Sequence, residues 1–279
     1  MDLNAVKKSF NKKLNIPSLP AVVSETIALL ESDSAGAREV GAVIAKDPPL
    51  TVKLLRIANS AVYGVKAPVI SPEHAAAVLG FDALRNMLLN VSVMDLFAHL
   101  EEYPNLDLTR LWTESRVCSR IARQLPGSWS DEVKRDDAYL CGLLHNIGCF
   151  VLLDQLGKDY VPVINEHWKT RKSLRALELD SFQFSHDQVG FLVGRKWGLP
   201  VGLLESLRSH LDNTGRVENL PLVAVTHVSR ILTGHLLTKG QGKPSGLIRS
   251  AVLERIGLVA KDLDHFAAGC KASLSELES

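Results

Sequence analysis

Apolar side chains recur about every three to four residues along most of the chain, and this helical period constrains the fold more than any other feature. Leu50, Leu54 and Ala58, for example, fall on one face of a helix. Lys53 and Arg56 fall on the opposite face, where they would meet water. Alternating patterns typical of strands are almost absent. The sequence therefore predicts an all-α protein.

Capping residues and prolines place the helix starts. Asp47 and Ser71 are residue types that cap helices, and each is followed by a proline, which fits the first helical turn. The segment "EEYPN" interrupts the helical pattern and forms a natural joint. We therefore expect a helical N-terminal lobe, residues 1–105, and a larger helical lobe, residues 106–279.

Charge gives little sign of a nucleic-acid partner. The chain has 32 basic and 31 acidic residues, so it has little electrostatic attraction to phosphate backbones. The stretch "REVGAVIAKDPPLTVKLLRIANS" has the length of a helix-turn-helix, yet its second helix offers only Lys53 and Arg56 as cations. Specific nucleic-acid binding is not expected.

Composition also indicates where the protein resides. No uninterrupted apolar run reaches the roughly 18 residues that a membrane span needs. The N-terminal segment "MDLNAVKKSFNKKLN" lacks the apolar core of a signal peptide. The four cysteines show no CxxC pairing, and three of them lie in apolar helical surroundings, which is typical of reduced core residues. We expect a cytoplasmic protein that does not associate with membranes.

Two motifs carry a family resemblance when they occur together: "KDPPLTVKLLRIANSAVYG" in the N-terminal lobe and "GLLHNIG" in the larger lobe. In this combination the chain resembles the HDOD family of bacterial signalling proteins, from about Ile16 to Gly257. The resemblance implies a helical lobe packed on a degenerate lobe of the HD-phosphohydrolase type. It also implies a regulatory role, with receivers, sensor kinases or cyclic-dinucleotide components as partners.

An HD-type hydrolase needs a first histidine, a His-Asp pair and a distant aspartate, because carboxylates and neutral imidazoles together hold the divalent ions that activate water. An asparagine in the pair offers no negative charge, and an arginine at the last position repels a cation. The resemblance implies no metal and no catalysis at these positions. In this chain they are occupied by Glu114, His145, Asn146 and Arg230.

Three histidines survive at plausible positions, His145, His186 and His210, although Ser209 stands where some active relatives carry a further histidine. A residual metal-dependent phosphohydrolase that uses these three histidines is therefore the alternative function. No short spacing typical of zinc ligands supports that alternative. The favoured interpretation is that the motif is a remnant of a catalytic site.

The remnant has a structural interpretation of its own. The stretch "YLCGLLHNIGCFVLL", residues 139–153, reads as one helix. One narrow face of this helix is made mostly of small residues, which would let another helix approach closely. Cys141, Gly142, His145 and Gly148 fall on that face.

The charged substitutions lead to one further hypothesis. If Glu114 and Arg230 share the former metal site, a buried arginine there needs an anionic partner. We therefore expect a Glu114–Arg230 ion pair in place of the metal. No cofactor is expected.

A turn in the N-terminal lobe is the remaining candidate site, and it contains Asn59, Ser60, Tyr63 and Gly64. One interpretation is a helix C-cap that fixes the shape of the lobe. The other is an exposed surface, with Lys66 nearby, that binds a partner or couples the lobes; both stay open. The sequence as a whole predicts a non-catalytic signal-transduction protein that acts through protein–protein interaction.

Overall fold

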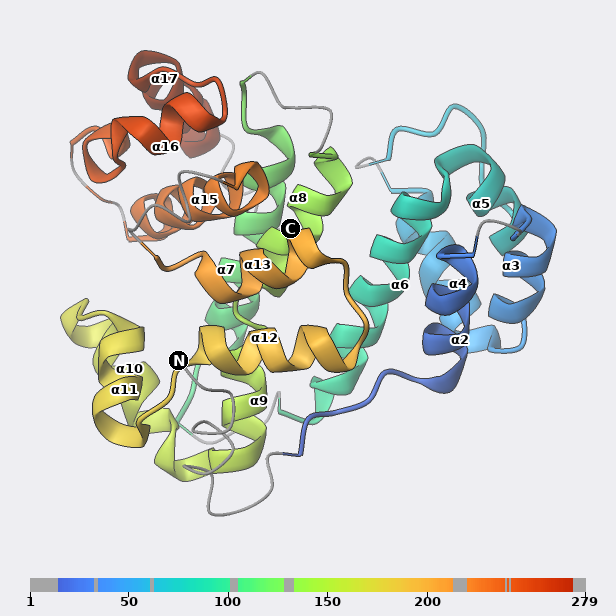
Figure 1. Ribbon diagram of the computed structural model, residues 1–279, viewed down its shortest axis with the longest axis horizontal. Helices are drawn as coiled ribbons and strands as arrows, with labels where there is room; N and C mark the ends of the chain where they lie inside the picture. Colours follow the sequence, from blue (N-terminus) through green and yellow to red (C-terminus); the bar gives the residue numbers. More distant parts are fainter. Residues whose placement is uncertain are drawn as a thin grey trace. The chain divides into compact units, whose positions relative to one another are not determined.

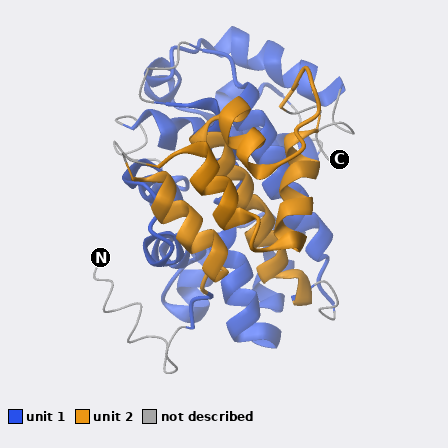
Figure 2. Cartoon of the chain, turned by 90° about the vertical axis from the view of Figure 1, so that its right-hand side faces the viewer, with its two compact units in different colours: residues 1–17, 100–279 blue, residues 18–99 orange. Residues whose placement is uncertain are grey.

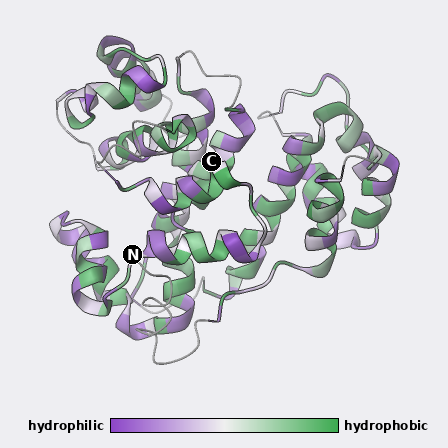
Figure 3. Ribbon diagram, viewed as in Figure 1, coloured by the Kyte–Doolittle hydropathy of each residue, from purple (hydrophilic) through white to green (hydrophobic). Residues whose placement is uncertain are grey.

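The computed structural model of the chain contains helices, turns and loops, with no strand in the part of the chain that it describes (Figure 1). The prediction of an all-α protein is confirmed. Most helices carry both hydrophobic and hydrophilic residues, as the helical period requires (Figure 3). The described residues are 15–32, 35–60, 63–100, 105–127, 133–212, 220–238, 240 and 242–272.

The chain divides into two compact units, which Figure 2 shows in different colours. Unit 2 comprises residues 18–99, and unit 1 comprises residues 1–17 and 100–279. Two hydrogen bonds tie the start of the described chain to unit 1: Lys196 Nζ donates to the Ile16 carbonyl over 2.6 Å, and Trp197 Nε1 donates to the Pro17 carbonyl over 2.9 Å.

Unit 2 is helical, and both expected caps are present. The Asp47 carboxylate accepts a hydrogen bond from the Leu50 amide over 3.0 Å, and the Ser71 hydroxyl accepts one from the His74 amide over 3.0 Å. These bonds satisfy amides that the first helical turn leaves without a partner. The helices of unit 2 are α2 Ala21–Leu30, α3 Ala37–Ile44, α4 Pro48–Ala58, α5 Pro72–Leu79 and α6 Phe81–Leu96.

Unit 1 contains the larger set of helices and the candidate site. Its longest helices, α7 and α15, pack against each other and against α8. The helices are α7 Leu108–Gln124, α8 Arg135–Leu144, α9 Ile147–Leu156, α10 Val161–Thr170, α11 Leu174–Phe182, α12 His186–Lys196, α13 Val201–Ser209, α15 Pro221–Leu237, α16 Ser250–Arg255 and α17 Ala260–Ala272, with 3-10 turns at Gly157–Asp159 and Pro244–Leu247. A further 3-10 turn, Ala98–Leu100, spans the residues at which unit 2 ends and unit 1 resumes.

The segment predicted as one helix over residues 139–153 is two helices, so that expectation is wrong. α8 ends at Leu144, and a turn at His145 and Asn146 precedes the start of α9 at Ile147. The His145 ring turns back and contacts the carbonyl of Gly142 over 2.7 Å. The break places the motif at a corner between two helices rather than in the middle of one.

Glycines on either side of this corner let other helices approach, as the small-residue pattern predicts. A Cβ on Gly142 would lie 2.6 Å from the Ser119 Cα of α7. A Cβ on Gly148 would lie 1.9 Å from the His186 carbonyl oxygen of α12. Because both neighbours are backbone atoms, only glycine fits at either position.

The segment from Arg135 to Asp159 contains a window long and apolar enough to cross a membrane, which the sequence reasoning did not anticipate. Within unit 1, however, 78% of that window is buried. Burial of this extent is the pattern of a core helix, so the window is weak evidence for a membrane span.

Candidate functional site

A cavity of about 490 Å³ lies within unit 1 at the corner between α8 and α9. Its walls come from α7, the α8–α9 turn, α10, the α10–α11 loop, α12 and α15. It brings together all but one of the residues that the family resemblance places at the former metal site, namely Glu114, His145, Asn146, His186 and Arg230. His210 is not among the residues that line the cavity, but its ring contacts the rings of His145 and His186.

His145 is a neutral histidine with a fixed tautomer. Its Nδ1 lies 2.7 Å from the Gly142 carbonyl, which can only accept, so Nδ1 carries the proton and Nε2 carries the lone pair. Burial lowers the pKa of His145 to about 3, and the nearby Arg230 adds to this effect. At neutral pH the ring therefore offers the cavity an acceptor rather than a charge.

His210 has the same tautomer for the same reason. Its Nδ1 lies 3.0 Å from the Leu207 carbonyl, and its buried Nε2 has no hydrogen-bond partner within the protein. Its ring centroid lies 5.5 Å from that of His145 and 5.8 Å from that of His186. Burial, reinforced by these two histidines, holds the pKa of His210 well below its ordinary value.

His186 differs because it belongs to a buried hydrogen-bond network that sequence reasoning missed. The Glu178 carboxylate accepts from His186 Nδ1 over 2.7 Å, from the His186 amide over 3.0 Å and from the Tyr160 hydroxyl over 2.5 Å. Burial alone would lower the pKa of His186, but the contacts with Cys149 and Glu178 raise it well above its ordinary value. The network ties α9, α11 and α12 together behind the cavity.

The prediction of a Glu114–Arg230 ion pair is wrong. Glu114 instead accepts from Arg110 Nε, one turn earlier on α7, over 3.3 Å, and the described residues contain no ion pair between Glu114 and Arg230. Helical spacing explains this choice, since side chains four residues apart are neighbours on a helix surface. Burial raises the pKa of Glu114, and Arg110 opposes that rise. Arg230 keeps a buried Nε without a hydrogen-bond partner in the protein.

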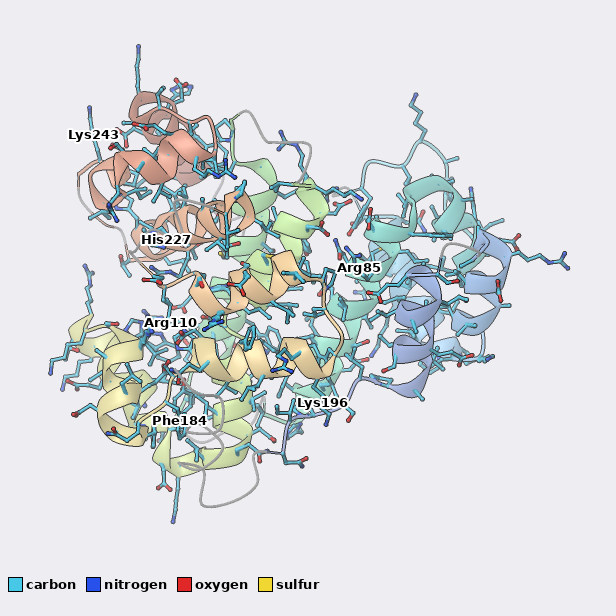
Figure 4. All side chains as sticks on the ribbon, viewed as in Figure 1. Arg85, Arg110, Phe184, Lys196, His227 and Lys243 are labelled. Atoms are coloured by element: carbon cyan, nitrogen blue, oxygen red, sulfur yellow. The ribbon has the colours of Figure 1, made fainter. Side chains whose placement is uncertain are left out.

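Four further cations line the cavity, and sequence reasoning missed them all. Figure 4 labels Arg110, whose guanidinium carbon lies 4.6 Å from the centroid of the Trp168 ring. The other three come from the end of α10, the following loop and the start of α11, where "RKSLR" is a basic run that could have been noticed. They are Arg171, Lys172 and Arg175.

The residues at the former metal site do not fit a divalent cation. In the described chain one group of three has its potential ligand atoms all within 4.8 Å of one another, and it consists of Cys149, Glu178 and His186. The Glu178 oxygens in that group are already occupied by Tyr160 and His186, so the group acts as a hydrogen-bond network. His145 and His210 do not belong to it, and Arg230 adds positive charge where a cation would bind.

The turn after α4 in unit 2 is a separate feature. The Asn59 side chain donates to the Leu55 and Val69 carbonyls and accepts from the Val69 amide, each over 2.8 Å. Asn59 thus fastens both ends of the turn, which favours the capping interpretation for this residue. Gly64 has a φ of 56°, in the left-handed region that favours glycine. Ser60 is half-buried, as is Tyr63.

Comparison with known proteins agrees with this architecture. A structure of an HDOD domain protein of unknown function from Geobacter sulfurreducens is 22% identical, with a TM-score of 0.77 over 99% of this chain and 95% of that one. A candidate phosphohydrolase from Shewanella amazonensis is 16% identical, with a TM-score of 0.71 over 99% of this chain and 96% of that one. A candidate signal transduction protein from Marinobacter aquaeolei is 20% identical, with a TM-score of 0.71 over 99% of this chain and 63% of that one.

A curated relative and a family profile complete the comparison. An uncharacterised protein of Treponema pallidum (strain Nichols) is 23% identical over 196 residues, which are 70% of this chain and 37% of that protein. The chain thus spans well under half the length of this relative. The profile of the HDOD domain matches residues 16–213, well over half of the chain. The protein belongs to the HDOD domain family.

Proposed function

We propose that this protein is a non-catalytic signal-transduction protein that acts by binding other proteins of a bacterial signalling pathway. One observation carries the proposal: Arg230 lines the cavity at the position that the HD pattern gives to a metal-binding aspartate. A guanidinium stays protonated in proteins, so it repels a divalent ion at any physiological pH. Membership of the HDOD family and the fold shared with a candidate signal transduction protein support the same role.

A second candidate, a residual metal-dependent phosphohydrolase, is favoured by one specific observation. The Nδ1 atoms of His145, His186 and His210 all face oxygen acceptors, which is the arrangement that metal-binding histidines adopt. Against it, the contacts with Cys149 and Glu178 raise the pKa of His186 and so favour an imidazolium, which cannot bind a metal through either nitrogen. We therefore rank hydrolysis second.

The partner-binding role can be tested through the turn after α4. Lys66 is exposed beside Gly64, so Lys66→Glu reverses a surface charge without touching the core. In quantitative affinity capture from the source organism, we expect the chain to enrich a receiver, a sensor kinase or a cyclic-dinucleotide protein. We expect Lys66→Glu to reduce that enrichment by about tenfold, a loss of roughly 1.4 kcal/mol in binding.

The matched control is Lys261→Glu, a charge reversal at an exposed lysine of α17 in unit 1. This variant should capture the same partner as the unaltered chain. Capture of no signalling protein by any of the three baits would contradict the proposed function. Equal capture by all three would leave the function standing and reject the turn as the binding surface.

A further inference from the structure

We propose that the cavity at the former metal site binds an organic phosphate, that is, a small molecule carrying one or more phosphoryl groups on a carbon skeleton. The charged side chains that line the cavity suit an anion better than a cation. Five cationic side chains and a single carboxylate, Glu114, line it. This binding goes beyond the protein–protein interaction proposed above and does not depend on it.

Carboxylates accompany only some of the five cations. Arg110 is paired with Glu114 over 3.3 Å, and Lys172 lies 3.4 Å from Glu166. Arg175 Nε lies 3.7 Å from the Asp187 carboxylate, a distance too long for a hydrogen bond. These three therefore contribute little net charge to the cavity.

Two arginines remain without a carboxylate partner among the described residues, Arg171 and Arg230. A terminal nitrogen of Arg171 makes one long contact, 3.4 Å, with the Thr238 carbonyl. Arg230 Nε is buried and has no hydrogen-bond partner in the protein. Arg175 Nε is also buried without a hydrogen bond, although the Asp187 carboxylate lies 3.7 Å away. Buried donors in folded proteins are nearly always satisfied, so guanidinium groups left in this state around one cavity indicate an anionic ligand.

The backbone at Arg171 points to the same conclusion. Arg171 ends α10 in the left-handed conformation, with φ 60° and ψ 17°. Glycine or asparagine holds that conformation at lower cost than arginine. The arginine is therefore explained by its side chain, which lines the cavity, rather than by the turn that it forms.

The size and lining of the cavity specify an organic rather than an inorganic phosphate. A volume of about 490 Å³ lies within the range of small-molecule sites and far exceeds that of a phosphate ion. The lining includes apolar residues from several elements, which suit a carbon skeleton. His145 Nε2 adds an acceptor for a hydroxyl group of such a ligand. These apolar residues are Leu111, Ile164, Trp168, Leu174 and Leu211.

Calorimetric titration of the purified chain tests this proposal with defined probes. The phosphorylated probes are ADP, glucose 6-phosphate and cyclic AMP; the comparison probes are adenosine, glucose and inorganic phosphate. We expect at least one phosphorylated probe to bind with a Kd below about 1 mM, and at least tenfold more tightly than its uncharged parent or inorganic phosphate. Binding of none of the three below that limit would overturn the proposal. So would equal binding of adenosine, glucose or inorganic phosphate.

Two variants locate the site. Arg230→Gln and Arg171→Asn each remove one unpaired cation, and asparagine is a residue that tolerates the left-handed turn. Each should weaken binding by about tenfold or more, consistent with loss of one charge-assisted contact. Arg195→Gln, at an exposed arginine outside the cavity, should leave the Kd unchanged. Unchanged binding in both cavity variants, with their melting temperatures intact, would show that the ligand binds elsewhere.

Discussion

The free energy of unfolding is expected to fall by up to about 4 kcal/mol per pH unit as pH drops from 6.5 toward 4. The cause is the set of buried histidines in unit 1. Burial lowers the pKa of His145 to about 3 and that of His227 to about 4, and it holds the pKa of His210 well below its ordinary value. In the unfolded chain each titrates near 6.5.

The sign follows from proton counting. Between pH 6.5 and 4 the unfolded chain binds up to three more protons than the folded chain, so acid favours unfolding by about 1.4 kcal/mol per pH unit for each histidine. The pKa of His186 is raised in the folded state, so this residue stays protonated when folded and opposes the loss only near pH 6.5, where the unfolded chain is about half protonated at that ring. Glu114 acts in the opposite direction above pH 4.5, because its raised pKa lets the folded chain bind up to one more proton there than the unfolded chain.

Urea unfolding at a series of pH values measures this slope. His227→Gln should reduce the dependence of the unfolding free energy on pH by about 1.4 kcal/mol per pH unit, the contribution of one proton. The reason is that the His227 ring stays neutral in the folded protein over most of this range. His265→Gln is the matched control, since His265 is exposed on α17. A stability that does not change between pH 6.5 and 4 would contradict the buried, neutral state of these histidines.

Gly148→Ala is expected to destabilise the protein by more than about 4 kcal/mol or to prevent folding. The added methyl would lie 1.9 Å from the His186 carbonyl oxygen and 2.9 Å from the Gly190 amide nitrogen. Both are backbone atoms of α12, so no side-chain rotation relieves the clash. The helices α9 and α12 would have to separate, which would disturb the Glu178–His186 contact behind the cavity.

Thermal and urea unfolding of the variant measure this effect. Gly269→Ala is the control, because a Cβ there meets nothing within 4 Å and the position lies inside α17. It should stabilise the protein by roughly 0.5–1 kcal/mol through helix propensity alone. A Gly148→Ala protein as stable as the unaltered chain would mean that α9 and α12 do not pack as closely as the structure has them.

Features of the fold that depend on neighbouring residues in the sequence could be predicted. The caps at Asp47 and Ser71 follow from local hydrogen bonding, and the small face with Gly142 and Gly148 follows from side-chain size. The break at His145 could not be predicted, because an apolar helical pattern continues through it and tertiary packing decides where the helix ends. Likewise, nothing in the sequence indicates that Lys196 and Trp197 hold the chain near residue 16.

The candidate site was predictable in position and only partly in chemistry. The family pattern located five of the residues that line the cavity, because that pattern fixes which helices meet there. It did not reveal which charges pair, and Glu114 binds Arg110 of its own helix rather than Arg230. The basic residues after α10 lie on a loop and belong to no HD motif, so only the structure shows that Arg171 and Arg175 face the same cavity.

Hydrolysis of bis(p-nitrophenyl) phosphate by the purified chain with added Mn²⁺ tests the central claim, a non-catalytic role, most directly. Because Arg230 lines the cavity and its guanidinium repels a divalent ion, we predict no release of p-nitrophenolate above that of a protein-free control at any Mn²⁺ concentration. The contradictory result is turnover that saturates with Mn²⁺ and is lost in the His145→Ala variant.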